Sequence, residues 1–304
     1  MPSFVWNSPT SEYINLVTGQ PLSGGVVPPD PEVVDPLADA GSLPLGQASY
    51  SVPAGAIFVS TGGVDTNSGT EGSPVASLTK ALELAPENGT IVVRAGTYNE
   101  GEDTQDASYP YGVLVQKNIT IQNYPGEVVW FDGSIPVTGA WTQSGSTWNT
   151  PYDRLFDRSP TSKSGDEDGW GAGTGAGGWW RAVDKPQASW PDMVFFDGTQ
   201  LEQATSLAEV GPGKLFIEGA TTTGMWFQGT KIHIGDNPAG HEVRYANKSK
   251  FITFVGATRA STLRGVGIRR YASYAPGFSA VYVIQKFTIE NVVTEDIRGY
   301  VYAP

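Results

Sequence analysis

The side chains best suited to chemistry in this sequence are six carboxylates that lie beside predicted strands. They are Asp132, Asp197, Glu202, Glu290, Glu295 and Asp296. Glycoside hydrolysis uses two carboxyl groups that face one sugar, about 5 to 10 Å apart according to the mechanism. Strands stacked in register could bring carboxylates from successive turns of the chain within that distance. No pair has a sequence spacing that requires catalysis, so solvated turn residues are the simpler interpretation.

Metal-assisted chemistry has less support in the residue pattern. β-Elimination needs a base, commonly Lys or Arg, and a Ca²⁺ ion that neutralises the uronate, and no Asp-rich cluster of that kind is present. The segment from Asp65 to Glu71 partly matches a Ca²⁺-binding loop but lacks the alternating ligands, and Asx-turns explain it more simply. The chain has no cysteine, which excludes thiolate metal sites and disulfides. We therefore predict no metal site and no cofactor.

The two histidines of the chain, His233 and His241, do not predict nucleophilic catalysis. His233 alternates with Ile232 and Ile234, which predicts that its side chain projects outward from a strand, with a surface role. No serine lies in a nucleophile-elbow pattern, so a Ser-His-Asp site is not expected. The glycine-rich run 165–178 lacks the Lys-Ser/Thr ending of a P-loop, so nucleotide binding is not expected either.

Three tryptophans in and after this glycine-rich run are the candidate glycan contacts: Trp170, Trp179 and Trp180. Exposed indole rings offer flat apolar faces on which sugar rings stack, and neighbouring glycines let the backbone approach a ligand closely. The alternative is that the rings are buried at a subunit contact or fasten this segment to the rest of the protein. Because tryptophan is usually mostly buried, this alternative is the simpler one.

The elements that must position these residues begin in the stretch 56–98. Residues 57–59 predict a short apolar strand, and the β-branched run 91–93 predicts a second, closed by a turn. Between them, apolar residues at positions 78, 81, 82 and 85 recur with helical spacing on one face. Ser77 is the expected N-cap of this helix, and Pro86 with Gly89 ends it.

Four short motifs follow one another in the same stretch. They are F-V-S-x-x-G-x-D from Phe58, G-T-x-G-S-P from Gly69, S-L-x-x-A-L from Ser77 and I-V-V-R-A-G-T-Y from Ile91. Together they resemble the start of right-handed parallel β-helix proteins of the pectate-lyase-like superfamily. The resemblance continues through residues 118–126, 196–198, 235–238 and 263–266, and so covers the chain from about Ala54 onward.

The resemblance implies an all-β fold, a right-handed parallel β-helix or solenoid. In that family the N-terminal helix caps the open end of the coil stack, and the following strand begins the first full coil. The scaffold carries lyases, hydrolases, epimerases and inert fibres alike, so the resemblance specifies the fold more than the function.

Short strands continue the pattern after Gly112. They are predicted at residues 113–115, 119–122 and 128–131, and again at 194–196, 215–217, 231–234 and 251–255. Residues 137–192 interrupt this rhythm and contain six of the nine tryptophans, which predicts an insertion that projects from the stack. Near the end, residues 262–266 align with 288–292 at an offset of 26, and 280–283 with 300–303 at an offset of 20. Such self-similarity is typical of a solenoid.

Residues 1–53 are predicted to form an extended N-terminal arm. Its second half is rich in Pro and Asp, which favours an extended linker over a helix. Such an arm could attach the protein to a larger assembly or act as a tether without docking. We therefore divide the chain into an attachment arm and linker, 1–53, and a parallel β-helix, 54–304. The last predicted strand has no capping element, so we expect further chain or another subunit to cover that edge.

Composition and charge limit the partners. The chain has 38 Gly, 22 Pro and 39% hydrophobic residues, which suits a turn-rich protein with a sizeable core. A formal net charge of −12 argues against nucleic acid as a partner, and the simpler interpretation of the acidity is that it serves solubility alone. No apolar run approaches the roughly 18 residues of a membrane span, so membrane insertion is not expected. No secretory signal is evident, and a chain trimmed of its signal would look similar.

These expectations favour a structural phage minor tail or tailspike-like protein, located on the virion and acting outside the cell at the host surface. The implied partners are other tail proteins through the arm, host surface polysaccharide, and two further copies in a homotrimer, as in the tailspikes that the sequence resembles. The alternative is a polysaccharide-degrading lyase or glycoside hydrolase on the same scaffold. A bacterial exopolysaccharide-processing protein is a third interpretation, less favoured without an export signal.

Overall fold

The computed structural model describes residues 4–7, 12–15, 42–103, 112–157, 192–223, 226–272, 280–298 and 301–303. The chain divides into two compact units, Met1–Gly41 and Ser42–Pro304. In the first unit, β1 (Phe4–Asn7) pairs with β2 (Glu12–Asn15) in an antiparallel hairpin. The fold and site described below belong to the second unit.

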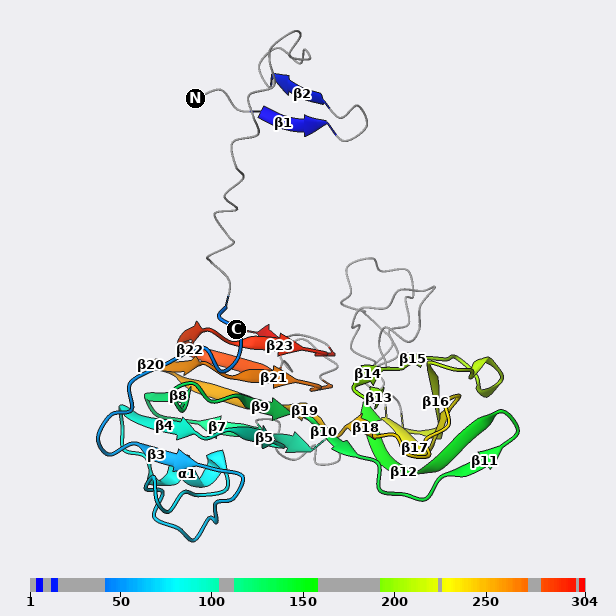
Figure 1. Ribbon diagram of the computed structural model, residues 1–304, viewed down its shortest axis with the longest axis horizontal. Coiled ribbons are helices and arrows are strands. Elements are labelled where there is room, and N and C mark those ends of the chain that lie inside the picture. The colour runs from blue at the N-terminus through cyan, green and yellow to red at the C-terminus, as the bar shows by residue number, and fades with distance from the viewer. Residues whose placement is uncertain are drawn as a thin grey trace. The chain divides into compact units, whose positions relative to one another are not determined.

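The second unit contains a stack of parallel strands contributed by successive passes of the chain, each of which we call a coil (Figure 1). The strands are β3 (Ile57–Val59), β4 (Gly89–Val93) and β5 (Gly96–Tyr98), then β7 (Val113–Val115), β8 (Ile119–Asn123) and β9 (Val129–Asp132), then β20 (Ile252–Arg264) and β21 (Gly267–Arg269), then β22 (Val281–Glu290), β23 (Val293–Glu295) and β24 (Tyr302–Ala303). One sheet has the order β24-β22-β20-β8-β4-β3, with β7 also paired to β20, and a second has the order β23-β21-β9-β5. We call this part the parallel stack.

Aliphatic side chains aligned across the coils form the core of the parallel stack. Ile91, Ile121 and Leu263 occupy one row of paired positions and are fully buried, whereas Ile289, next in the row on β22, is exposed. Burial of each such side chain stabilises the fold by about 1.5–3 kcal/mol. Between coils, Arg94 forms a bidentate pair with Glu127, with Nη2 2.8 Å from Oε1 and Nε 3.0 Å from Oε2.

The predicted helix is confirmed as α1 (Leu78–Leu84). The Ser77 hydroxyl oxygen accepts a hydrogen bond from the Lys80 N–H at 3.1 Å, which caps the first turn. Leu78, Ala81 and Leu82 are buried in the core of the parallel stack. The helix packs against β3, the terminal strand of its sheet, and so covers one end of the stack.

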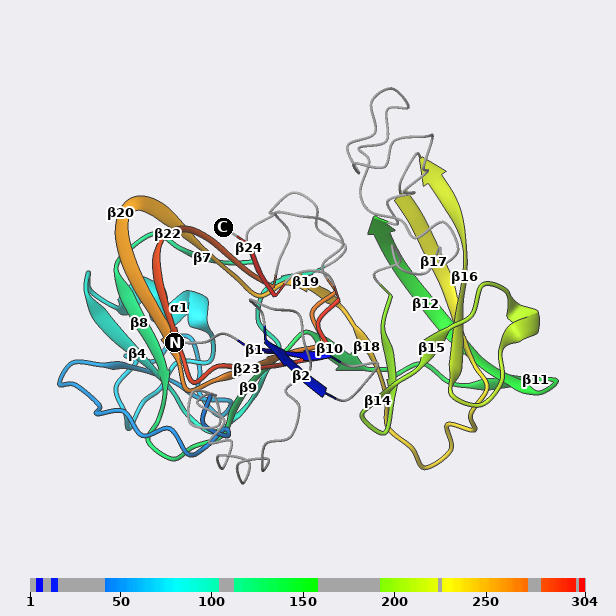
Figure 2. The same cartoon turned by 90° about the horizontal axis from the view of Figure 1, so that it is seen from above.

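Between β9 and β20 the chain leaves the parallel stack and forms two mainly antiparallel sheets, which we call the antiparallel module (residues 134–246; Figure 2). Its strands are β10 (Ser134–Pro136), β11 (Thr142–Ser144), β12 (Thr147–Asp157), β13 (Val194–Phe196), β14 (Thr199–Gln200), β15 (Glu202–Gln203), β16 (Lys214–Thr223), β17 (Trp226–Ile234) and β18 (Val243–Ala246), with a 3-10 turn at Leu207–Glu209. The sheet orders are β10-β18-β13-β14 and β11-β12-β17-β16-β15. The module has its own core, which includes Tyr152, Leu215 and Ile232. The chain returns through β19 (Lys248–Lys250), which pairs with β6 (Glu102–Asp103).

Two predicted boundaries differ from the structure. Predicted strands at 194–196, 215–217 and 231–234 exist, but they belong to the antiparallel module, which extends to residue 246 instead of ending near 192. Residues 42–53, assigned to the arm, lie against the parallel stack. There the Leu43 N–H donates to Asn291 Oδ1 at 3.0 Å, and Asn123 Nδ2 donates to the Ala48 carbonyl at 3.1 Å. The compact unit therefore begins at Ser42.

The 26-residue repeat is confirmed by strand pairing, because Thr262, Leu263 and Arg264 lie opposite Thr288, Ile289 and Glu290. The second alignment is wrong by one residue, since Val281 pairs with Tyr302, an offset of 21 instead of 20. Both the odd and the even positions of these strands carry apolar residues, so the sequence pattern did not fix the register. A slip of one residue would move every side chain of a strand to its opposite face. The described residues thus confirm the all-β prediction. None of their helices is long and apolar enough to span a membrane.

Candidate functional site

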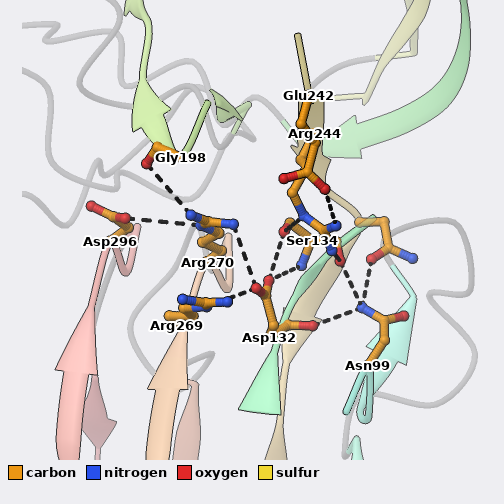
Figure 3. A network of polar contacts seen from close by, with 10 residues as sticks. Asn99, Asp132, Ser134, Gly198, Glu242, Arg244, Arg269, Arg270 and Asp296 are labelled. Atoms are coloured by element: carbon orange, nitrogen blue, oxygen red, sulfur yellow. Dashed lines mark hydrogen bonds and ion pairs between the residues drawn. The ribbon is translucent and has the colours of Figure 1, made fainter. Parts of the chain in front are cut away.

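A network of buried and partly buried polar side chains joins the parallel stack to the antiparallel module (Figure 3). At its centre is Asp132, the last residue of β9, which is 1% exposed. Its Oδ1 accepts hydrogen bonds from the Ser134 N–H at 2.9 Å and hydroxyl at 2.6 Å, and its Oδ2 accepts one from Arg269 Nε at 2.7 Å. Arg269 reaches Asp132 because the two residues are paired across β21 and β9.

The module contributes Arg244 of β18 to the same network. Arg244 Nε donates to the Ser134 hydroxyl at 3.0 Å, Nη2 donates to the Ser134 carbonyl at 2.8 Å, and Nη1 pairs with Glu242 Oε1 at 3.0 Å. From the first coil, Asn99 Nδ2 donates to the Asp132 carbonyl at 2.8 Å. The Asp132 carboxylate is thus occupied in holding the two parts together, and it is poorly placed to exchange a proton with a substrate.

Arg270 follows β21 and has an unusual backbone and environment. Its φ is +59°, in the left-handed region that side chains other than Gly, Asn and Asp rarely adopt. The residue is 7% exposed, and its guanidinium lies 3.5 Å from Asp132 Oδ2, 3.4 Å from the Gly198 carbonyl and 4.0 Å from Asp296 Oδ2. Its Nε has no hydrogen-bond partner. Burial lowers the pKa of Arg270 below its ordinary value.

An exposed histidine–carboxylate pair is formed by His241 and Asp197, the residue before the Gly198 whose carbonyl Arg270 contacts. Asp197 and Gly198 form the turn between β13 and β14, and their φ values of +46° and +82° are typical of an Asp-Gly type I′ hairpin. His241 Nδ1 is 2.6 Å from Asp197 Oδ2, and the His241 ring lies 4.7 Å from the Phe196 ring. The hydrogen bond with His241 lowers the pKa of Asp197. Both side chains are about half exposed.

The structure brings the carboxylates of two of the six predicted residues, Asp132 and Asp296, to one arginine. Asp132 and Asp296 both contact Arg270, and Asp197 adjoins the carbonyl that Arg270 contacts. Glu202 pairs instead with Lys214 at 3.8 Å, and Glu290 pairs with Arg264 at 3.7 Å. Glu295 lies opposite Arg269 in the pairing of β23 with β21.

The prediction for His233 is wrong. It lies on the opposite face of β17 from its isoleucine neighbours, as alternation requires, but it is 5% exposed, and its Nε2 is 2.8 Å from Glu218 Oε2. Alternation identified the face of the strand but not whether other side chains cover that face.

Asp65, whose segment was explained by Asx-turns, instead fastens the backbone just before α1. Its Oδ1 accepts hydrogen bonds from the N–H groups of Ala76 at 2.8 Å and Ser77 at 2.9 Å. Among the described residues, no group of three or more His, Asp or Glu could hold a metal ion. Trp170, Trp179 and Trp180 lie outside the described residues, so their role as glycan contacts stays a prediction.

Arg244, Arg269 and Arg270 were missed by the sequence analysis. One signal was available, because Arg270 and Asp296 are 26 residues apart and occupy equivalent places after β21 and β23. Both have positive φ values, +59° and +48°. The same repeat relates Gly265 to Asn291, which also have positive φ, so these two successive coils turn at equivalent left-handed residues.

These features define an all-β protein in which a stack of parallel strands is joined to an antiparallel module. A family described as a protein of unknown function, DUF1565, matches residues 61–113. The uncharacterized protein YwoF of Bacillus subtilis (strain 168) is 30% identical over 109 residues, which cover 36% of this chain and 21% of YwoF. The chain thus spans only about a fifth of that curated relative.

Two solved structures are similar. XylC, solved in complex with xylose, has a TM-score of 0.51 and 17% identity, over 77% of this chain and 40% of XylC. A structure described as a glycoside hydrolase has a TM-score of 0.42 and 13% identity, over 72% of this chain and 51% of that one. At 17% identity, the likeness to XylC shows a shared fold and does not extend to a shared activity.

Proposed function

We propose that this chain is a right-handed parallel β-helix that binds glycan at a host cell surface as a structural component of a phage tail. The observation that carries the proposal is the architecture, in which a stack of in-register parallel strands carries an antiparallel module through the Asp132 network. A rigid stack of this kind presents side chains at fixed spacing, which suits recognition of a repeating polymer. Its fold likeness to XylC, a protein solved with xylose, agrees with a carbohydrate ligand.

The tail role extends the same proposal. Residues 1–41, which form a compact unit of their own, would attach the chain to other tail proteins, and three copies would assemble side by side. Antibodies raised against the chain should label tails of the phage whose genome encodes it, as seen by electron microscopy. Particles without label, or a chain absent from purified virions, would overturn the tail role while leaving glycan binding open.

Glycan binding is tested on the purified full chain with an array of surface polysaccharides and by light scattering on the same sample. We expect a trimer that retains polysaccharide and releases no oligosaccharide. A monomer that binds none of the arrayed glycans would refute the proposal.

A second candidate, glycoside hydrolysis, is favoured by one observation. Asp296 Oδ2 lies 4.0 Å from Arg270 Nε, and Arg270 also contacts the carbonyl of Gly198, which follows Asp197 in the β13–β14 turn, so one arginine links the elements that carry two partly exposed carboxylates. Glycoside hydrolases need two carboxyl groups, one protonated so that it can donate a proton and one ionised. Release of reducing sugar by the wild-type chain, abolished by Asp197→Asn or Asp296→Asn, would establish this candidate in place of simple adhesion.

A further inference from the structure

We propose that the outer edge of β22 is an interaction surface for a second copy of this chain, whose own β22 pairs with it antiparallel about Thr288. Among the described residues, only β24 lies on this edge, and it pairs with Val281 and Tyr282 alone. Beyond them, residues 283–290 of β22 face β20 on one side and no described strand on the other. An open strand edge of this kind is a template for pairing with another chain.

The inward side chains at this edge are incompletely covered. Leu263 on β20 is fully buried, whereas Ile289, its partner on β22, is 41% exposed. Phe287 is partly buried, with its ring 4.4 Å from the Phe254 ring. Burial of this apolar surface favours a partner. Because α1 covers the opposite end of the parallel stack, a head-to-tail contact is blocked, and two copies meet through the same edge of each.

The backbone determines which residues of β22 offer hydrogen bonds to that partner. The Glu290 carbonyl accepts a hydrogen bond from the Gly265 N–H at 3.0 Å, on the side of β20. Successive residues of a strand direct their N–H and C=O groups to alternate sides, so Phe287 and Ile289 direct theirs to the outer edge. An antiparallel pair centred on Thr288 therefore exchanges hydrogen bonds between Phe287 of each copy and Ile289 of the other.

Charge selects this register. Pairing centred on Thr288 sets Lys286 of each copy opposite Glu290 of the other, on the face away from Phe287 and Ile289, and both charged residues are exposed. Opposite charges directly across an antiparallel pair stabilise it, whereas like charges destabilise it. Pairing centred on Phe287 would use the same backbone groups, but Lys286 would then face Thr288 and no opposite charges would meet.

This pairing avoids β24 and leaves the sides of the parallel stack free. Tyr282, which β24 covers, would face residue 294 of the second copy in this register. Residues 293–295 form β23, which belongs to the other sheet, so the strand of the second copy has turned away before it reaches β24. The proposal is therefore independent of glycan binding and of side-by-side assembly, and it joins such assemblies in end-to-end pairs.

Sedimentation equilibrium of the full chain over a range of concentrations measures the pairing. We expect the mass to double as concentration rises, whether the starting particle holds one copy or three. Glu290→Lys and Lys286→Glu should each raise the dissociation constant about 10-fold or more, because two like-charge contacts replace two opposite-charge ones. The double variant restores both contacts and should lie within about threefold of wild type.

The matched control is Glu202→Lys, which makes the same change of charge at an exposed position of the antiparallel module. It should leave the dissociation constant within about twofold of wild type. Melting temperatures of all chains are compared with wild type, so that a folding defect is recognised.

Thr288→Cys tests the register directly, because the chain has no cysteine of its own. Two thiols that face each other across the two-fold axis lose two electrons and two protons to an added oxidant, copper phenanthroline, and form a disulfide. Ser144→Cys, at an exposed position on β11, is the control and should cross-link far more slowly.

Four results would overturn the proposal. They are a mass that does not double, single charge variants that pair as wild type does, a double variant that does not recover pairing, and Thr288→Cys that cross-links no faster than Ser144→Cys. None of these results bears on glycan binding, which the polysaccharide array tests separately.

Discussion

Asp132→Asn is expected to lower the free energy of unfolding by about 3–5 kcal/mol, the cost of removing one partner from a buried ion pair. In the wild type, both carboxylate oxygens accept hydrogen bonds, from Ser134 on one side and Arg269 on the other. The asparagine amide has the same shape, but its nitrogen donates hydrogen bonds where a carboxylate oxygen accepted them. That nitrogen must then face the donors of either Ser134 or Arg269. It also leaves Arg270, whose side chain is 9% exposed, without its nearest counter-charge.

Urea unfolding followed by tryptophan fluorescence measures this loss as a shift of the midpoint at constant slope. The matched control is Glu202→Gln, which breaks an exposed pair with Lys214 and should cost less than about 1 kcal/mol. Because the Asp132 pair is buried, its contribution should persist at about 1 M salt, where the Debye length is near 3 Å. A midpoint shift no larger than that of the control, or one that disappears at high salt, would refute the reasoning.

Four further predictions concern other parts of the second unit. Gly235→Ala should destabilise the protein by more than about 2 kcal/mol, because a Cβ at 235 would lie 2.0 Å from a backbone atom of Gly211. Gly211→Ala should cost far less in the same thermal melts, because a Cβ at 211 meets nothing within 4 Å. Asn291→Ala removes an amide that holds residues 42–53, so limited proteolysis should cut that segment faster, and an unchanged rate would contradict the role given to it. Glu127→Gln should make the free energy of unfolding less dependent on pH in the acid range. The hydrogen bond from its arginine partner lowers the pKa of Glu127 in the folded protein. The resulting stability is present above the pKa of the unfolded state and is lost as pH falls through the pKa of the folded state. Glu100→Gln should have the opposite effect on this pH dependence, because burial raises the pKa of Glu100 and the wild type loses stability as pH rises through that pKa. Urea titrations at several pH values measure the free energy of unfolding of both variants. Equal slopes of this free energy against pH for the two variants would contradict both pKa shifts.

Local patterns predicted a large part of the parallel stack. Helical spacing and the cap at Ser77 defined α1, because such signals act within one or two turns of the chain. The 26-residue repeat predicted the pairing of Leu263 with Ile289, because each coil must place its apolar residues over those of the last. The same reasoning failed by one residue at Val281, where apolar side chains on both faces allow either register.

The sequence by itself therefore determined the kind of element and much of the coil register, since both depend on short-range spacing. Only the tertiary structure decided which sheet each strand joins, because a strand at 231–234 has the same alternation in a hairpin as in a coil. The tertiary structure also decided which partners each polar side chain contacts. Asp132 meets Arg269, and Asp197 meets His241, across separations of 137 and 44 residues, and pairing at such distances follows from how the sheets stack. Arg270 contacts both Asp132 and the Gly198 carbonyl only because the parallel stack and the antiparallel module are held together there.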